Sequence, residues 1–465
     1  MNSIHGHNHT WVIIQDDDRI GRFEYLLIVR GQFIWTIWNF FKEKCLELET
    51  EKAYAQAIGM LIDFMFARGN EFVDVIKRSD FFHAFAGAVW NGTVRDGTDP
   101  SGLWWFHRSR RRATKLLRCV CELSDWLTEI HNGTNINPVV RAASLTEQIT
   151  FWRRWNTKKA TALLGHLSNS SNAKEKSKFT RRSSFPRNQS KILKDPPAFP
   201  KDRLAQLLSA GYATSGVSRF EPIWKRFNIR DILVTLLLHF GGLRISEVFQ
   251  IWVCDVFVDI DSKSSIVIVL DPSDGIIEAA DPITGGKQKM TRAAYLRTRF
   301  NLSPLTFLTG KRHVGWKNPL LTEHEQNGFR VHWNSKRASK LFLVLYRIYL
   351  LHVRSMNLSH PFLFVTKDGQ PMNPEAFRRI HRKAVRKIGL TPSKGLGTTP
   401  HGHRHNYGQY GRECGLSNKI LMVAMHHASP TSQEVYTGPT LAEVDNAMRG
   451  IPDAAEGLDF STFSK

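Results

Sequence analysis

Near the C-terminus, residues 401–404 read HGHR and residues 427–436 read HASPTSQEVY. His401 and Arg404 are three residues apart, so from the start of a helix their side chains can point toward one place. Histidine transfers protons near neutral pH, and a guanidinium group offers a planar fork for two phosphate oxygens. The pair therefore indicates chemistry on a phosphate group, but an HxxR pattern alone is common by chance.

The second stretch ends in a tyrosine, whose hydroxyl can act as a nucleophile. Tyr436 follows His427 by nine residues, and His427 stands at the end of a predicted helix. Tyr407 and Tyr410 are rival nucleophiles by residue type. Both lie on the predicted helix just after Arg404, where we expect them to pack.

A third pattern lies upstream, where residues 242–247 read GLRISE. Arg244 stands near a predicted helix start, and Glu247 follows three residues later on the same face, so the carboxylate can orient the guanidinium. Taken alone, this pair predicts a structural salt bridge.

The three patterns occur in one order: an arginine, then HxxR, then a histidine with a tyrosine nine residues on. In this the chain resembles the tyrosine recombinases, the phage integrase family, over roughly residues 200–450. The text around TTPHGHRHNYGQ and GWKNP is similar to that of the large integrases carried with small mobile gene clusters in Gammaproteobacteria. The resemblance implies a site-specific recombinase that integrates or excises a mobile element through a 3′-phosphotyrosine, with no metal or other cofactor.

The residue types suit this chemistry. Breaking a phosphodiester needs a nucleophile, neutralisation of charge on the non-bridging oxygens, and a proton for the departing 5′ oxygen. Arg244 and Arg404 would neutralise the charge, and Tyr436 would attack the phosphorus. His401 would accept the tyrosine proton, and His427 would donate a hydrogen bond to a phosphate oxygen.

One departure from the family concerns the second histidine. The family usually has a glycine immediately before it, whereas this chain has His426. Either His426 or His427 can therefore be the functional residue, and the spacing to Tyr436 favours His427.

A second departure concerns the family's catalytic lysine, which lies in a short hairpin between the two strands after the first arginine. Here that interval is stretched to residues 272–328. It holds four candidates, Lys287, Lys289, Lys311 and Lys317. The neighbouring Trp and Gly of GWKN suggest a packed turn and favour Lys317, while Lys287 and Lys289 remain alternatives.

The composition favours a nucleic-acid partner. The chain has 465 residues, with 64 Lys and Arg against 42 Asp and Glu, so its formal net charge is +22. This excess suits binding to a polyanion, and we expect double-stranded DNA. The hydrophobic content of 42% is too high for a disordered basic protein.

The five cysteines are scattered and predict neither a disulfide framework nor a zinc site. No apolar run is long enough to span a membrane. We therefore expect a cytoplasmic protein without a metal site, and the resemblance implies a bacterial, nucleoid-associated one.

The N-terminal half has apolar residues at helical spacing and no convincing alternation. This predicts an all-helical DNA-binding domain over residues 23–166, after a tail formed by residues 1–22. Residues 167–196 are rich in Ser, Asn, Lys and Arg and predict a basic flexible linker.

The catalytic domain is expected over residues 197–450, with a C-terminal tail over 451–465. Residues 264–270 form a β-branched run and residues 329–333 alternate, so both predict strands that pair. The rest has helical patterning. The expected fold class is mainly α with a small antiparallel β-sheet.

Basic residues on predicted helices are candidates for phosphate contact. They lie in two aromatic and basic clusters of the N-terminal half and on the helix that begins at Pro374. The candidates are Arg110, Arg111, Arg112, Arg153, Arg154, Arg378, Arg379, Arg382, Lys383 and Arg386.

Residues 440–450 predict a helix with an apolar stripe just beyond Tyr436. The stripe is formed by Leu441, Val444, Ala447 and Met448. It can pack on its own domain or, as the resemblance implies, on a neighbouring protomer. The second arrangement predicts a homotetramer on paired DNA sites, with accessory proteins of the same element as further partners.

Two other functions are weighed against recombination. A type IB topoisomerase uses the same chemistry but is disfavoured by the compact helical N-terminal half. A non-catalytic DNA-binding protein on the same scaffold would need no nucleophile, so the joint presence of tyrosine, arginines and histidines argues against it.

Overall fold

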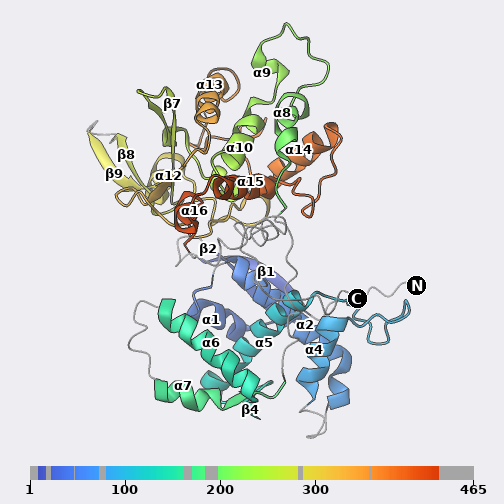
Figure 1. The fold of residues 1–465 in the computed structure, drawn as a ribbon. Helices are drawn as coiled ribbons and strands as arrows, with labels where there is room; N and C mark the ends of the chain where they lie inside the picture. Colours follow the sequence, from blue (N-terminus) through green and yellow to red (C-terminus); the bar gives the residue numbers. More distant parts are fainter. Residues whose placement is uncertain are drawn as a thin grey trace, which may run out of the picture. The chain divides into compact units, whose positions relative to one another are not determined.

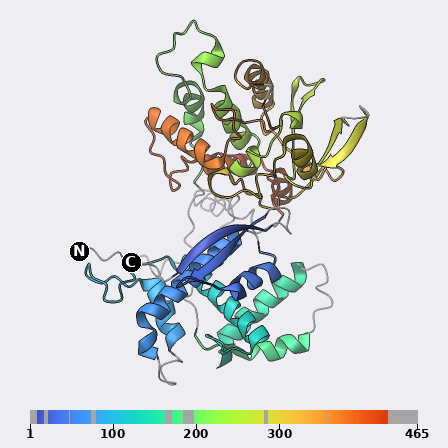
Figure 2. The same cartoon turned by 180° about the vertical axis from the view of Figure 1, so that it is seen from behind.

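The computed structural model describes residues 9–16, 22–46, 48–72, 80–161, 170–183, 197–280, 286–355 and 358–428. The chain forms two compact units, Met1–Lys191 and Ile192–Lys465, and the division falls inside the predicted linker. Both units are mainly helical and carry small antiparallel sheets (Figures 1 and 2). The predicted fold class is confirmed.

The N-terminal unit opens with a three-stranded antiparallel sheet in the order β1-β2-β3. β1 (His9–Asp16) pairs with β2 (Arg22–Val29), and β3 (Gln32–Phe33) lies on the other side of β2. The predictions of a tail over residues 1–22 and of an all-helical domain after it are therefore wrong.

The strands escaped the sequence analysis because their apolar residues do not alternate with polar ones. Leu26 and Leu27 are adjacent in β2 and both are buried. Trp11 of β1 stacks on Phe41, with ring centroids 6.2 Å apart. A strand that buries consecutive residues lacks the period of two that identifies a half-exposed strand.

Helices make up most of the N-terminal unit. They are α1 (Trp35–Glu43), α2 (Leu48–Arg68), α4 (Phe81–Asn91), α5 (Arg110–His131), α6 (Leu145–Thr161) and α7 (Ser170–Ser177). The first four of these enclose an aromatic core, represented by Phe40, Phe64, Phe85 and Trp126.

Part of the predicted linker is folded. α7 lies inside it, and so does β5 (Phe179–Arg181), which pairs antiparallel with β4 (Val139–Ala142). The prediction of a flexible linker is therefore wrong for residues 170–183.

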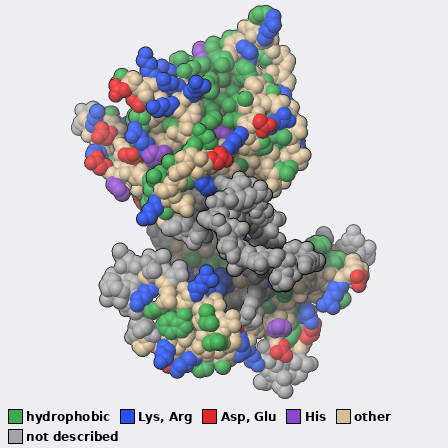
Figure 3. Space-filling view, in the orientation of Figure 1, with side chains coloured by type: hydrophobic (Ala, Val, Ile, Leu, Met, Phe, Trp, Pro, Cys, Tyr) green, Lys and Arg blue, Asp and Glu red, His purple; other side chains and the backbone are tan. Residues whose placement is uncertain are grey.

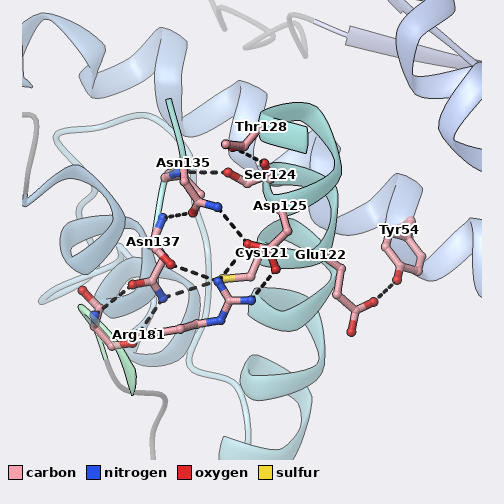
Figure 4. A network of polar contacts seen from close by, with 11 residues as sticks. Tyr54, Cys121, Glu122, Ser124, Asp125, Thr128, Asn135, Asn137 and Arg181 are labelled. Carbon is pink, nitrogen blue, oxygen red and sulfur yellow. Dashed lines mark hydrogen bonds and ion pairs between the residues drawn. The ribbon is translucent and has the colours of Figure 1, made fainter. Parts of the chain in front are cut away.

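Figure 4 shows the contacts that hold β5 in place. Arg181 forms an ion pair with Asp125 of α5 at 2.5 Å and donates a hydrogen bond to the carbonyl of Asn137 at 2.9 Å. The Asn137 amide oxygen accepts from the backbone N–H of Ser183 at 2.9 Å. Polar residues that satisfy one another in this way order a segment whose composition alone suggests flexibility.

The second unit is built around α10 (Ile229–His239), which is buried along nearly its whole length. A three-stranded antiparallel sheet in the order β10-β7-β6 packs against α13 (Lys336–His352). Its strands are β6 (Val256–Asp259), β7 (Ser264–Leu270) and β10 (Gly328–Arg330). The predicted pairing of residues 264–270 with the strand near 329 is confirmed.

The long interval between β7 and β10 contains a hairpin of β8 (Ile276–Ala280) and β9 (Lys287–Thr291), followed by α12 (Arg292–Phe300). Arg292 anchors this insertion, because it is fully buried, forms an ion pair with Asp255 and lies over the ring of Trp252. Figures 1 and 2 show the hairpin projecting from one edge of the unit.

The remaining helices complete the second unit. They are α8 (Leu204–Gln206), α9 (Ile223–Arg226), α11 (Ile245–Val248), α14 (Pro374–Lys387), α15 (Pro400–Glu413) and α16 (Asn418–Ala424). Short 3₁₀ turns at Lys201–Arg203, Val253–Asp255 and Gly310–Arg312 and a π turn at Leu207–Gly211 lie between them, and a further 3₁₀ turn, Gly69–Phe72, follows α2 in the N-terminal unit. Among the helices described, none combines the length and apolar character that a membrane span requires.

Candidate active site

The first arginine of the site caps the short helix α11. Arg244 Nη1 donates to Glu247 Oε1 at 2.5 Å, and its backbone N–H donates to Glu247 Oε2 at 2.6 Å. Glu247 is completely buried. The predicted salt bridge is present. Glu247 accepts from both the guanidinium and the backbone N–H of Arg244, so the arginine is held at two points.

The turn between α10 and α11 brings α15 close. Gly242 has a φ of +66°, and a Cβ at this position would lie 2.8 Å from the ring of Tyr407. Only glycine fits this conformation and this approach without strain. The Gly242 carbonyl, exposed by the turn, accepts a hydrogen bond from Arg404 Nη1.

Arg404 of α15 is the hub of the site. Its side chain is buried, and its Nη2 donates to the carbonyl of Met425 and to Nε2 of His427, the latter at 2.7 Å. Its Nη1 lies 3.7 Å from Glu247 Oε2. One guanidinium therefore joins three segments that are far apart in the sequence.

The charges at this point suit a phosphate. Arg244 and Arg404 both pair with Glu247, so two positive groups share one carboxylate and leave one net positive charge. A phosphodiester carries one negative charge and gains a second as a pentacovalent phosphorane forms. A preorganised excess of positive charge stabilises that state more than the ground state.

The structure separates the roles of the two adjacent histidines. His427 bonds Arg404, and because arginine only donates, Nε2 of His427 is the acceptor and its ring proton is on Nδ1. His426 stacks on Phe329 with ring centroids 3.8 Å apart. His426 has a φ of +55°, which accounts for the glycine that the resembled family usually has there.

His401 stands one turn before Arg404 on α15. Part of the residue reaches solvent, yet burial of the ring and the charges of His405, Arg404, Lys394 and Lys317 lower its pKa to about 3. The imidazole is therefore neutral at physiological pH and can accept a proton.

Lys317 lies three residues before Leu320, whose backbone N–H donates to the carbonyl of His426 at 3.2 Å, so the segment that carries Lys317 adjoins the turn of His427. Lys287 and Lys289 lie instead on the projecting hairpin, where Lys287 faces Glu278 at 4.0 Å. Lys311 lies in a short turn, and its carbonyl accepts from Asn373.

A second lysine, Lys394, was not predicted from the sequence. The charge of Lys394 lowers the pKa of both His401 and His405. Its loop packs tightly on α15, since a Cβ at Gly402 would lie 1.7 Å from the carbonyl oxygen of Gly397. The sequence feature that could have indicated Lys394 is the basic, glycine-containing run SKGLG just before HGHR.

Three buried histidines link α15 to two neighbouring helices. His403 Nδ1 lies 3.0 Å from His239 Nδ1 on α10, and His403 Nε2 lies 2.9 Å from His381 Nε2 on α14. Phe199 stacks on His403 with centroids 4.3 Å apart. The chain of three rings ties α10, α14 and α15 together directly beside Arg404.

The proposed nucleophile, Tyr436, lies outside the described residues, as does the predicted helix over residues 440–450. Of its rivals, Tyr407 is buried and its hydroxyl donates to the His332 carbonyl at 2.7 Å, which fits a packing role. Tyr410 is exposed on the outer side of α15.

The DNA-binding candidates lie at helix surfaces. On α14 the five cations are exposed, while Phe377, Ala384 and Val385 form the buried face. Arg111, Arg112, Arg153 and Arg154 are exposed on α5 and α6, and Arg110 is half-buried over the ring of Trp90. Figure 3 shows Lys and Arg side chains on the visible face of both units.

Within the described ranges, no group of three or more His, Cys, Asp or Glu side chains is arranged to hold a metal ion.

Residues 324–442 match the family model described as the phage integrase family. A search of curated proteins finds no significant match. Several solved structures are similar at low identity. The XerH site-specific recombinase bound to a palindromic difH substrate is 11% identical with a TM-score of 0.44, and the match covers 86% of this chain and 79% of that one.

A lambda integrase (75–356) dimer bound to a COC′ core site is 12% identical with a TM-score of 0.39, over 88% of this chain and 97% of that one. XerA recombinase is 13% identical with a TM-score of 0.31, over 90% and 97%. These structural similarities are too weak to assign a role to any residue.

Proposed function

We propose that the chain is a site-specific DNA recombinase of the phage integrase family, whose model matches residues 324–442, and that it acts through Tyr436. The observation that carries this proposal is the convergence of Arg244 and Arg404 on the buried Glu247, with His427 at 2.7 Å from Arg404. The family motifs that are distant in the sequence thus form one cationic centre.

In the proposed reaction, the Tyr436 oxygen attacks phosphorus, a Tyr–O–P bond forms, and the bond from phosphorus to the 5′ oxygen breaks. His401, which its lowered pKa keeps unprotonated at physiological pH, accepts the phenol proton. Lys317 donates a proton to the departing 5′ oxygen. The two arginines stabilise the negative charge on the non-bridging oxygens.

The 3′-phosphotyrosine conserves the energy of the phosphodiester. A 5′ hydroxyl from another strand can attack it, which reverses the first step and releases Tyr436 without ATP. The substrates we propose are the two ends of a mobile element and their target sites, bound by a homotetramer.

The direct test uses nicked suicide duplexes taken from the ends of the element that encodes the protein. After incubation, a denaturing gel separates free DNA from a covalent protein–DNA adduct. We expect the full-length protein to form the adduct. A protein that binds these duplexes and forms no adduct would be a non-catalytic DNA-binding protein.

Tyr436→Phe should abolish the adduct and leave DNA binding nearly unchanged, because only the hydroxyl is removed. The matched control is Tyr410→Phe, which changes an exposed tyrosine of α15 and should leave the adduct unchanged. Adduct formation by Tyr436→Phe would show that the nucleophile is assigned to the wrong residue.

A further inference from the structure

The segment that carries Lys317 is fastened at both ends, although it belongs to a long insertion. The buried Gln250 donates through Nε2 to the carbonyl of Val314 at 2.9 Å. The backbone N–H of Leu320 donates to the carbonyl of His426 at 3.2 Å. Residues 314–320 are therefore attached both to the chain just after α11 and to the turn that carries His427.

Between these two attachments runs a column of three aromatic rings. Trp316 stacks on Phe329 with centroids 6.0 Å apart and planes 21° apart. Phe329 stacks in turn on His426 at 3.8 Å and 26°. Phe329 and His426 are completely buried. The column starts at the residue before Lys317 and ends at the residue before His427.

The His426 ring serves this column as a flat surface. Both of its ring nitrogens are buried and make no hydrogen bond within the described part of the chain. Burying an unsatisfied imidazole is unfavourable, so the ring must be retained by its packing. Its backbone φ of +55° turns His427 toward Arg404 while the His426 ring remains on Phe329.

We propose that the aromatic column of Trp316, Phe329 and His426 positions Lys317 for proton donation to the 5′ oxygen, in register with His427. This rests on the proposed recombinase function. A lysine ammonium has a flexible stem, so its placement depends on where its backbone is held. Trp316 therefore acts as a positioning residue through Lys317.

The test compares a normal nicked substrate with one that has sulfur in place of the scissile 5′ oxygen. A thiolate leaves without a proton, so this substrate bypasses the proton donor. Lys317→Ala should cleave the normal substrate about 100-fold or more slowly and recover most of that loss on the sulfur substrate. Trp316→Ala should lose about 10-fold or more and recover in the same way.

Three further variants sharpen the comparison. Trp316→Phe keeps an aromatic ring in the column and should cleave within about threefold of the wild type. His426→Asn tolerates the positive φ but removes the ring, and should resemble Trp316→Ala. Trp224→Ala removes a tryptophan that stacks on His352 elsewhere in the unit, and should lose no rate that sulfur restores.

Equal losses for Trp316→Ala on the oxygen and sulfur substrates would overturn the positioning role and leave a purely structural one. The same loss in Trp316→Phe would also overturn it, because the column would still be present. Absence of any adduct with the wild-type protein would instead refute the proposed function, so the two failures are distinguishable.

Discussion

A lysine could not make all the contacts that Arg404 makes in the site. Its guanidinium bonds the carbonyls of Gly242 and Met425 and the ring of His427 from one plane. A lysine ammonium is a single point charge and cannot satisfy these three acceptors together. We expect Arg404→Lys to lower the single-turnover cleavage rate by about 100-fold or more.

The matched control for this prediction is Arg347→Lys, which changes an exposed arginine on α13. It should cleave at nearly the wild-type rate in the same assay. If Arg404→Lys cleaved as fast as this control, Arg404 would not be a phosphate-stabilising group.

The sequence predicts the site residues unevenly. Arg244, Arg404 and Tyr436 stand in motifs with fixed spacing, so the sequence alone predicts them, and Tyr436, outside the described residues, stays a prediction. The choice between His426 and His427 depends on a backbone φ of +55° and on a bond to Arg404, neither of which is visible in a sequence. The sequence favours Lys317 through its neighbours Gly315 and Trp316, but the bond from Leu320 to His426 that attaches its segment to the site is a tertiary property.

At the scale of elements, α15 depends on the buried histidine chain. Burial lowers the pKa of His239 to about 4, with a contribution from Lys201, and that of His381 to about 3. The pKa of His403 is lowered well below its ordinary value by burial and by the two other rings. All three rings are neutral in the folded protein near neutral pH.

This predicts a loss of stability in mild acid. Between an unfolded pKa of about 6.5 and the folded values, the unfolded chain binds more protons, so the free energy of unfolding falls as the pH falls. At pH 5 each histidine contributes a loss of at most about 2 kcal/mol. The urea midpoint of the full-length protein should decrease steadily from pH 7 to pH 5.

His403→Leu tests the origin of this decrease. It removes one titrating ring and leaves an apolar side chain in the space, so the midpoint should depend less steeply on pH. A control, His352→Leu, changes a histidine that stacks on Trp224 and is not one of the three linked histidines, and it should keep the wild-type slope. An unchanged slope in His403→Leu would place the acid sensitivity elsewhere.

Elements differ in how well the sequence reveals them. α14 was predictable because its exposed cations and buried apolar residues follow the period of a helix. β2 was not, since its adjacent buried leucines hide the alternation of a strand. The fold of residues 170–183 depends on the ion pair between Arg181 and Asp125, which the sequence places 56 residues apart.

At the scale of the whole molecule, the chain consists of two compact units. The net charge of +22 provides attraction to DNA without selecting a sequence. Recombination also requires two cleaved sites to be held together. Cleavage by isolated protomers must therefore be prevented, and we propose that the segment beyond Tyr436 prevents it.

The apolar stripe in residues 440–450 is the basis of that prediction. If it docks on a neighbouring protomer, assembly and the position of Tyr436 are coupled, so a lone monomer does not cleave. We expect the free protein to be monomeric and to form a tetramer on two DNA sites. Truncation after Gly438 should keep binding to a single half-site but eliminate the synaptic complex and recombination, as measured by gel shift and strand exchange.

The control for truncation is an internal change of the stripe. Leu441→Asp and Val444→Asp together should reproduce the loss of synapsis in a chain of full length, which separates the role of the apolar face from that of the tail after it. Recombination at the normal rate by either variant, or a stable tetramer of the wild type without DNA, would show that assembly and cleavage are not coupled through this segment.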